Sequence, residues 1–176
     1  MTKLFRVSRG TTTFICSLLT MCYAGLVCAA APIIPPPPTI NATSYLLIDA
    51  TSQKVLVEHN PHERKAPASL TKIMTAYLAA QEISAGRISP MDEVLISIRA
   101  WRTGGSKMFI REGTKVQVSD LMKGIVIQSG NDASIAIAEH IAGSESAFAD
   151  MMNQQASVLG MKNSHFRNAT GLPDDE

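Results

Sequence analysis

The amino-acid sequence predicts an α+β fold, with an antiparallel sheet and a cluster of helices. Two short β-prone runs open the folded part, helical segments gather after them, and the two kinds of element do not alternate as in a parallel sheet. The chain of 176 residues is 45% hydrophobic and 5% aromatic. Its length and composition are those of one medium-sized globular domain.

The first 31 residues have the composition of a secretory signal peptide. A basic start is followed by an almost uncharged apolar run over residues 14–31, which ends in the small residues Ala29, Ala30 and Ala31, an A-x-A-like cleavage site. This run approaches the length of a membrane-spanning helix, so an uncleaved anchor is the alternative. We therefore expect an exported protein.

All cysteines of the chain, Cys16, Cys22 and Cys28, lie in this leader. Its removal leaves no thiol for a disulfide, a zinc site or a cysteine nucleophile. A lipoprotein interpretation of Cys28 is weak because residue 25, three positions earlier, is glycine and not leucine.

Residues 32–40 include four consecutive prolines and predict an extended polyproline II linker. The runs 45–49 and 54–58 then predict an antiparallel hairpin. A buried helix is expected from Pro67 to about Glu82, because apolar residues recur there at helical spacing after a proline in the first turn.

The rest of the chain predicts mainly helices joined by short loops. We expect a short strand at 94–97, a loop at 101–105, helices at 118–128, 132–141 and 144–159, and turns without periodicity from 163 to 176. The opening hairpin would be marginal as an isolated two-stranded sheet. We therefore expect residues 41–176 to be part of a longer domain whose later strands are missing.

Ser69 and Lys72 form an S-x-x-K motif at the start of the predicted helix. Residues three apart share a helix face, so the hydroxyl and the amine can come within hydrogen-bond reach. Burial lowers the pKa of a lysine, and a neutral amine can accept the serine proton. The alternative is a capping serine beside a solvated lysine, which suits an isolated match of this kind.

Ser129, Gly130 and Asn131 form a second candidate motif between two predicted helices. A loop there can present a hydroxyl that relays a proton and an amide that both donates and accepts hydrogen bonds. The alternative is an interhelical turn in which Asn131 caps the next helix. The order S-x-x-K and then S-x-N is that of penicillin-binding proteins and β-lactamases, in which a K-T-G completes the site.

Four ordered stretches, residues 67–72, 103–109, 128–133 and 165–173, together closely resemble the serine-type D-alanyl-D-alanine carboxypeptidases. These are the low-molecular-mass penicillin-binding proteins, in one superfamily with the serine β-lactamases. The resemblance covers the chain from about Asn41 to the end. It implies the N-terminal part of a β-lactamase/DD-peptidase-like fold, with the active site between an antiparallel sheet and a helical cluster.

The resemblance also implies the reaction and its residues. Ser69 would be the nucleophile acylated by substrate or penicillin, Lys72 the proton acceptor, and Ser129 and Asn131 the pair that relays a proton and holds the substrate. The partners would be peptidoglycan stem peptides ending in D-Ala-D-Ala and β-lactam antibiotics, with no cofactor. The expected location is the periplasm or the outer face of the cytoplasmic membrane, held through a C-terminal anchor absent from this sequence.

The sequence departs from the family pattern because no Lys-Thr-Gly follows Ser129. That strand and the C-terminal domain are missing from residues 41–176, so we expect this stretch alone to be inactive. The alternatives are a serine β-lactamase, a non-catalytic penicillin-binding module, or a fragment without a stable fold. Replacement of Ser69 or Lys72 would favour the non-catalytic module, and both residues are present.

Other classes of function find little support in the sequence. Basic and acidic residues are interspersed and the formal net charge is +1, which argues against a nucleic-acid-binding face. The four histidines lack metal-ligand spacing, and no glycine-rich phosphate loop is present.

Overall fold

The computed structural model describes residues 35–174, which belong to two compact units, Met1–Glu63 and Arg64–Glu176. The predicted signal peptide with its cysteines and the first residues of the predicted linker lie outside the described residues. Residues 35–40 of the linker are exposed and form no helix or strand. Among the described residues, no helix combines the length and the apolar character needed to cross a membrane.

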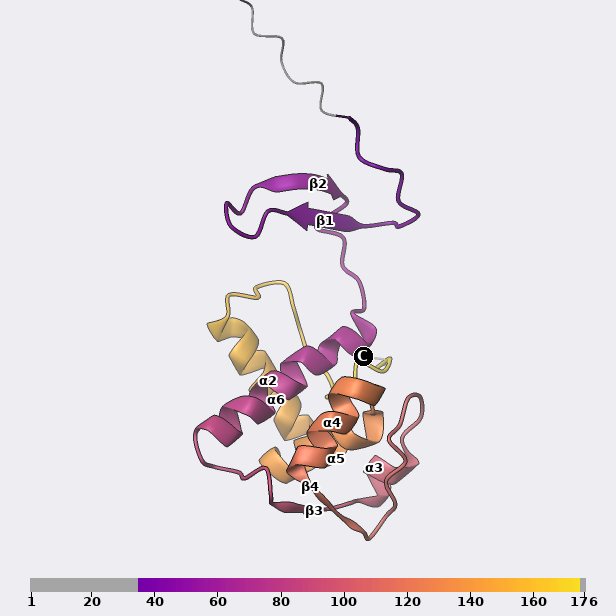
Figure 1. The fold of residues 1–176 in the computed structure, drawn as a ribbon, viewed down its shortest axis with the longest axis vertical. Helices are drawn as coiled ribbons and strands as arrows, with labels where there is room; N and C mark the ends of the chain where they lie inside the picture. Colours follow the sequence, from indigo (N-terminus) through magenta and orange to yellow (C-terminus); the bar gives the residue numbers. More distant parts are fainter. Residues whose placement is uncertain (1–34, 175–176) are drawn as a thin grey trace, which may run out of the picture. The chain divides into compact units, whose positions relative to one another are not determined.

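The first unit contains the predicted antiparallel hairpin, β1 (Tyr45–Ile48) and β2 (Val55–His59) (Figure 1). Tyr45 lies opposite His59, and their rings stack with centroids 5.5 Å apart. Asp49 holds the turn, because its carboxylate accepts hydrogen bonds from the backbone N–H and the hydroxyl of Ser52, at 2.6 and 2.7 Å. These bonds, the backbone one first, lower the pKa of Asp49.

The second unit is a helical cluster built around α5 (Asn131–Ala142). Every residue from 131 to 138 is buried, so this helix is covered on all sides, as expected for a central helix. It packs against α2 (Thr71–Ser84), α4 (Val118–Gln128) and α6 (Glu145–Val158). Apolar periodicity predicts all four helices, with boundaries within a few residues of those observed.

The start of α2 differs from the regular helix that the sequence predicts. The first turn is a 3-10 helix, η1 (Ala68–Leu70), and α2 follows it directly. The expected burial of this helix holds for one face of α2, which enters the core with Met74 and Leu78. Outside this face Ile73 of α2 and Leu70 of η1 are 68% and 67% exposed.

A two-stranded antiparallel sheet, β3 (Glu93–Leu95) and β4 (Lys115–Gln117), and the short helix α3 (Ile98–Arg102) complete this unit. The strand β3 lies near its predicted position, whereas the sequence does not predict β4, since three residues with one apolar side chain carry no strand pattern. The predicted loop at 101–105 is partly wrong: α3 includes Trp101 and Arg102 and begins after Ser97, whose hydroxyl accepts from the Ala100 N–H.

Candidate active site

The structure brings Ser69 and Lys72 together at the start of α2. Lys72 Nζ lies 3.2 Å from Ser69 Oγ, as the three-residue spacing predicts for one face of a helix. Ser69 is exposed, whereas Lys72 is only 5% exposed. An accessible hydroxyl therefore lies in hydrogen-bond contact with a buried amine.

The surroundings of Lys72 favour its neutral form. The second partner of Nζ is the backbone carbonyl of Thr170, at 2.8 Å, and among the described residues Lys72 forms no ion pair with a carboxylate. Burial without a counterion penalises the ammonium form and lowers the pKa of Lys72 from its ordinary value of 10.5. A larger share of this amine is thus free to accept a proton near neutral pH than for an exposed lysine.

The second unit has left-handed backbone at Ala68, Phe109 and Ser129, the non-glycine residues with positive φ in its described part. Ala68 immediately precedes Ser69, and Ser129 is the first residue of the S-G-N motif. Phe109 belongs to the segment that packs on the end of that motif. Each such conformation costs about 1–3 kcal/mol, and strain of this kind concentrates at functional sites. Two of the three positions therefore lie in or directly beside the two motifs; Gln53 and Asn60 of the first unit share this conformation outside them.

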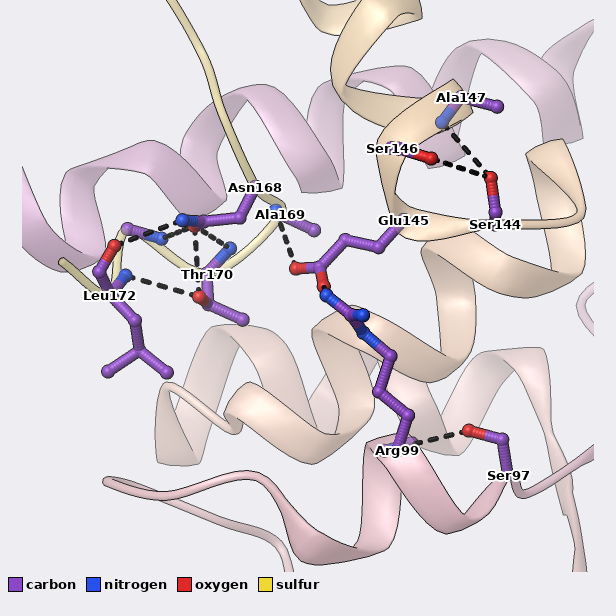
Figure 2. Close-up of polar contacts among 12 residues, drawn as sticks. Ser97, Arg99, Ser144, Glu145, Ser146, Ala147, Asn168, Ala169, Thr170 and Leu172 are labelled. Carbon is purple, nitrogen blue, oxygen red and sulfur yellow. Dashed lines mark hydrogen bonds and ion pairs between the residues drawn. The ribbon is translucent and has the colours of Figure 1, made fainter. Parts of the chain in front are cut away.

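Residues 168–172, here termed the Asn168 loop, carry the carbonyl that Lys72 contacts. Asn168 Oδ1 accepts hydrogen bonds from the backbone N–H groups of Thr170 and Gly171 and from the Thr170 hydroxyl, at 2.7–3.1 Å (Figure 2). The preceding carbonyl, that of Ala169, accepts from the buried Thr75 hydroxyl of α2 at 2.8 Å. The Asn168 bonds fix the shape of the loop, and the Thr75 bond attaches it to α2 next to the contact with Lys72.

Gly171 allows the Asn168 loop to lie directly on the backbone beside Ser69. Its φ is +76°, and a Cβ atom at this position would lie 1.8 Å from the carbonyl oxygen of Ala68 and 2.8 Å from Thr71 Oγ1. We expect Gly171→Ala to lower the free energy of unfolding by about 2–5 kcal/mol, the sum of left-handed strain and a backbone clash. Urea unfolding of the full-length protein measures this loss.

Gly160 provides the matched control, because its φ is +75° but no atom lies within 4 Å of the place that a Cβ would take. Gly160→Ala should therefore show only the left-handed strain, about 1–2 kcal/mol. Equal losses for the two variants would mean that the close contact between Gly171 and Ala68 does not exist in solution.

The S-G-N motif joins α4 to α5. Ser129 ends α4 and is partly buried, and Gly130 precedes the first helical residue of α5, which is Asn131. A side chain at position 130 would meet Asp132 Oδ1 at 3.0 Å and the Gly124 carbonyl at 3.2 Å, so only glycine fits without displacement. The motif therefore has a compact backbone that fixes the positions of its serine and its asparagine.

The motif is the interhelical turn that the alternative describes, but its second part is wrong, because the N-cap of α5 is Gly130 and not Asn131. The buried Asn131 amide donates to the carbonyl of Gly104 at 2.7 Å, and the Asn131 N–H donates to that of Ser106, also at 2.7 Å. Among the described residues the hydrogen-bond partners of Lys72 do not include Asn131.

Asp132, which belongs to no motif predicted from the sequence, holds the backbone of residues 108–110. Its carboxylate is fully buried and accepts from the backbone N–H groups of Met108, Phe109 and Ile110, at 2.9–3.2 Å. It also accepts from the N–H of Ala133 at 2.9 Å. Four N–H donors satisfy the buried carboxylate and tie the loop before β4 to the start of α5.

The structure thus joins Ser69 to Lys72 directly and places Ser129 and Asn131 on a separate, rigid turn of the same unit. From the sequence, Thr170 and Gly171 are turn residues only, and the contact of Thr170 with Lys72 is not predicted. The signal for the turn is present, since asparagine two residues before Thr170 is typical of an Asx-turn. No local pattern indicates which helix such a turn contacts.

The comparisons with known proteins find relatives of one family. The family model described as D-alanyl-D-alanine carboxypeptidase matches residues 31–176. D-alanyl-D-alanine carboxypeptidase DacA of Escherichia coli (strain K12) is 47% identical over 148 residues, which cover 81% of this chain and 37% of the relative.

Solved structures show the same similarity. The D-alanyl-D-alanine carboxypeptidase DacD from Francisella tularensis is 45% identical, with a TM-score of 0.78 over 87% of this chain and 37% of that one. Penicillin-Binding Protein D2 from Listeria monocytogenes, solved in an ampicillin-bound form, is 26% identical, with a TM-score of 0.70 over 80% of this chain and 56% of that one.

The present chain spans about 37% of the length of the first two relatives. Within that span, the family match, the identity to curated members and the similarity of fold agree with one another. The chain belongs to the D-alanyl-D-alanine carboxypeptidase family of serine peptidases.

Proposed function

We propose that the protein containing these residues is a serine-type D-Ala-D-Ala carboxypeptidase, which removes the terminal D-alanine from peptidoglycan stem pentapeptides. The observation that carries the proposal is the Ser69–Lys72 pair. An exposed hydroxyl lies 3.2 Å from an amine that is buried and has no carboxylate partner among the described residues. A nucleophile paired with a base of lowered pKa is the arrangement that covalent acyl transfer requires.

In the proposed reaction the neutral amine of Lys72 accepts the Ser69 proton while Oγ attacks the carbonyl carbon of the penultimate D-alanine. The bond from this carbon to the nitrogen of the terminal D-alanine then breaks, and that nitrogen receives a proton through Ser129. The acyl-enzyme ester is hydrolysed by water, which regenerates the Ser69 hydroxyl. We assign to Asn131 the role of holding the substrate amide, since its side chain both donates and accepts hydrogen bonds.

The same serine would react with β-lactams, whose strained amide carbonyl takes the place of the scissile one. The family relation supports this proposal, because a relative has been solved with ampicillin bound. In this proposal β-lactams inhibit the enzyme covalently, since the acyl-enzyme they form is hydrolysed slowly.

The location of the proposed substrate indicates where the protein must act and which segments would bring it there. Peptidoglycan lies outside the cytoplasm, so we propose that residues 1–31 direct export to the periplasm and that residues 32–40 form a linker. Residues 41–176 would then be part of the catalytic domain at the outer face of the cytoplasmic membrane. The family match over residues 31–176 includes both this linker and residues 41–176.

The proposal is tested with the full-length protein and two pentapeptides that differ only in the configuration of the last residue. We expect release of D-alanine from the peptide ending in D-Ala-D-Ala, little release from the one ending in D-Ala-L-Ala, and stoichiometric labelling by fluorescent penicillin. Rapid turnover of penicillin without peptide hydrolysis would indicate a β-lactamase instead. Neither labelling nor hydrolysis would indicate a non-catalytic module and contradict the proposal.

A further inference from the structure

We propose that Glu145 positions Lys72 indirectly, by holding the Asn168 loop that Lys72 contacts. The inference rests on the proposed function of the Ser69–Lys72 pair. Glu145 lies 76 positions along the chain from Ser69 and belongs to neither motif. Its carboxylate lies at the junction of α6, α3 and the Asn168 loop, as Figure 2 shows.

The two oxygens of Glu145 have separate partners. Oε2 accepts from Nε and Nη2 of Arg99, at 3.0 and 2.5 Å, whereas Oε1 accepts from the backbone N–H of Ala169 at 3.1 Å. Glu145 is only 5% exposed, and the Arg99 side chain is 66% exposed. The buried carboxylate therefore binds Arg99 through one oxygen and the backbone of the Asn168 loop through the other.

One peptide unit, that between Ala169 and Thr170, separates the N–H that donates to Glu145 from the carbonyl that accepts from Lys72. The Ala169 N–H donates to Glu145, the Ala169 carbonyl accepts from Thr75, and the Thr170 carbonyl accepts from Lys72 Nζ. Two helices thus hold this short stretch of backbone from opposite ends. Since Lys72 contacts Ser69 and the Thr170 carbonyl, the position of that carbonyl determines the direction in which the amine points toward Ser69.

The position of Glu145 in α6 gives a reason for a charged residue at this site. It is the first residue of the helix, directly after the N-cap Ser144, where the helix dipole favours a negative charge. A cavity of about 420 Å³, lined in part by Arg99, Glu145 and Thr170, adjoins the carboxylate and admits water. If Arg99 is truncated, water can therefore hydrate Oε2 while Oε1 keeps its bond to Ala169.

Because the two contacts use different oxygens of Glu145, substitutions can remove the loop contact or the ion pair separately. Glu145→Ala and Glu145→Asp both remove the bond to Ala169, the second because its carboxylate is one methylene shorter while its charge remains. Arg99→Ala removes the ion pair but keeps the loop contact. The three variants are made in the full-length protein.

The measurement is the rate constant for acylation by penicillin, determined separately from the affinity of the initial complex. We expect a loss of about 10- to 100-fold for the alanine and aspartate variants, because misplacing a reacting group by about 1 Å can cost about 10²-fold. Arg99→Ala should stay within about threefold of wild type. Equal losses for Glu145→Ala and Arg99→Ala, or none for Glu145→Ala and Glu145→Asp, would overturn the inference.

A readout that needs no activity distinguishes failure of this inference from failure of the proposed function. Hydrogen exchange of the Ala169 and Gly171 amides should be faster in Glu145→Ala and Glu145→Asp than in wild type, and nearly unchanged in Arg99→Ala. Unchanged exchange in Glu145→Ala would overturn the positioning role, even in an active enzyme. Absence of wild-type acylation would contradict the proposed function, while the exchange data would still report on the loop.

Discussion

Ser69→Ala should abolish covalent labelling by penicillin and reduce D-alanine release to background. The variant removes the hydroxyl that forms the ester in the proposed reaction, and loss of the nucleophile in a serine hydrolase costs about 10⁶-fold in kcat. The side chain is exposed and its replacement leaves the buried core unchanged, so the free energy of unfolding should change by about 0.5 kcal/mol or less. Gel fluorescence after incubation with labelled penicillin measures the effect.

Ser157→Ala is the matched control for this prediction. Ser157 is an exposed serine on α6, in the same unit but outside both motifs. Its replacement should leave labelling at the wild-type rate. Persistent labelling of Ser69→Ala at a comparable rate would assign the nucleophile to another residue.

Lys72→Ala should slow acylation by about 10²–10⁴-fold, the contribution that a positioned general base makes. The wild-type rate should rise with pH as Lys72 loses its proton. Because burial lowers the pKa of Lys72, this rise should occur below the ordinary lysine value of 10.5. In Lys72→Ala the same limb of the pH profile should disappear. Stopped-flow acylation, followed across a wide pH range up to the ordinary lysine value, measures both effects.

Lys72→Arg separates the role of a base from that of a positive charge. The guanidinium keeps the charge but does not deprotonate in this pH range, so this variant should also be slow. Acylation of Lys72→Arg near the wild-type rate would show that Lys72 acts as a charge and not as a proton acceptor.

The same lowered pKa affects stability. The unfolded chain binds a proton at Lys72 more tightly than the folded protein does, so the contribution of this residue to stability falls as pH decreases from its unfolded-state pKa through its folded-state pKa. Above the unfolded-state pKa the penalty is absent. The pH range in which the amine is neutral and reactive is therefore also the range in which its burial is best tolerated.

The parts of the site that the sequence predicts are local. The spacing of Ser69 and Lys72 alone predicts their contact, because a helical turn brings them together whatever the rest of the fold does. The long helices α4, α5 and α6 are predictable for a similar reason, since each has enough residues to display its apolar periodicity.

The parts that the sequence does not predict depend on contacts between distant segments. Lys72 meets the Thr170 carbonyl across 98 positions, and Arg99 meets Glu145 across 46. Backbone carbonyls have no side-chain signature, and a glutamate at a helix start looks the same whether solvated or buried. Short elements such as β4 and α3 are missed or misplaced because so few residues carry no measurable periodicity.

In the proposed reaction Ser69 Oγ is the atom that becomes acylated. Digestion of the penicillin-labelled full-length protein, followed by tandem mass spectrometry, locates the acylated residue. We predict one penicilloyl group per protein, on Ser69. An adduct on Ser129 or on any other residue, with Ser69 unmodified, would contradict the assignment of Ser69 as the nucleophile.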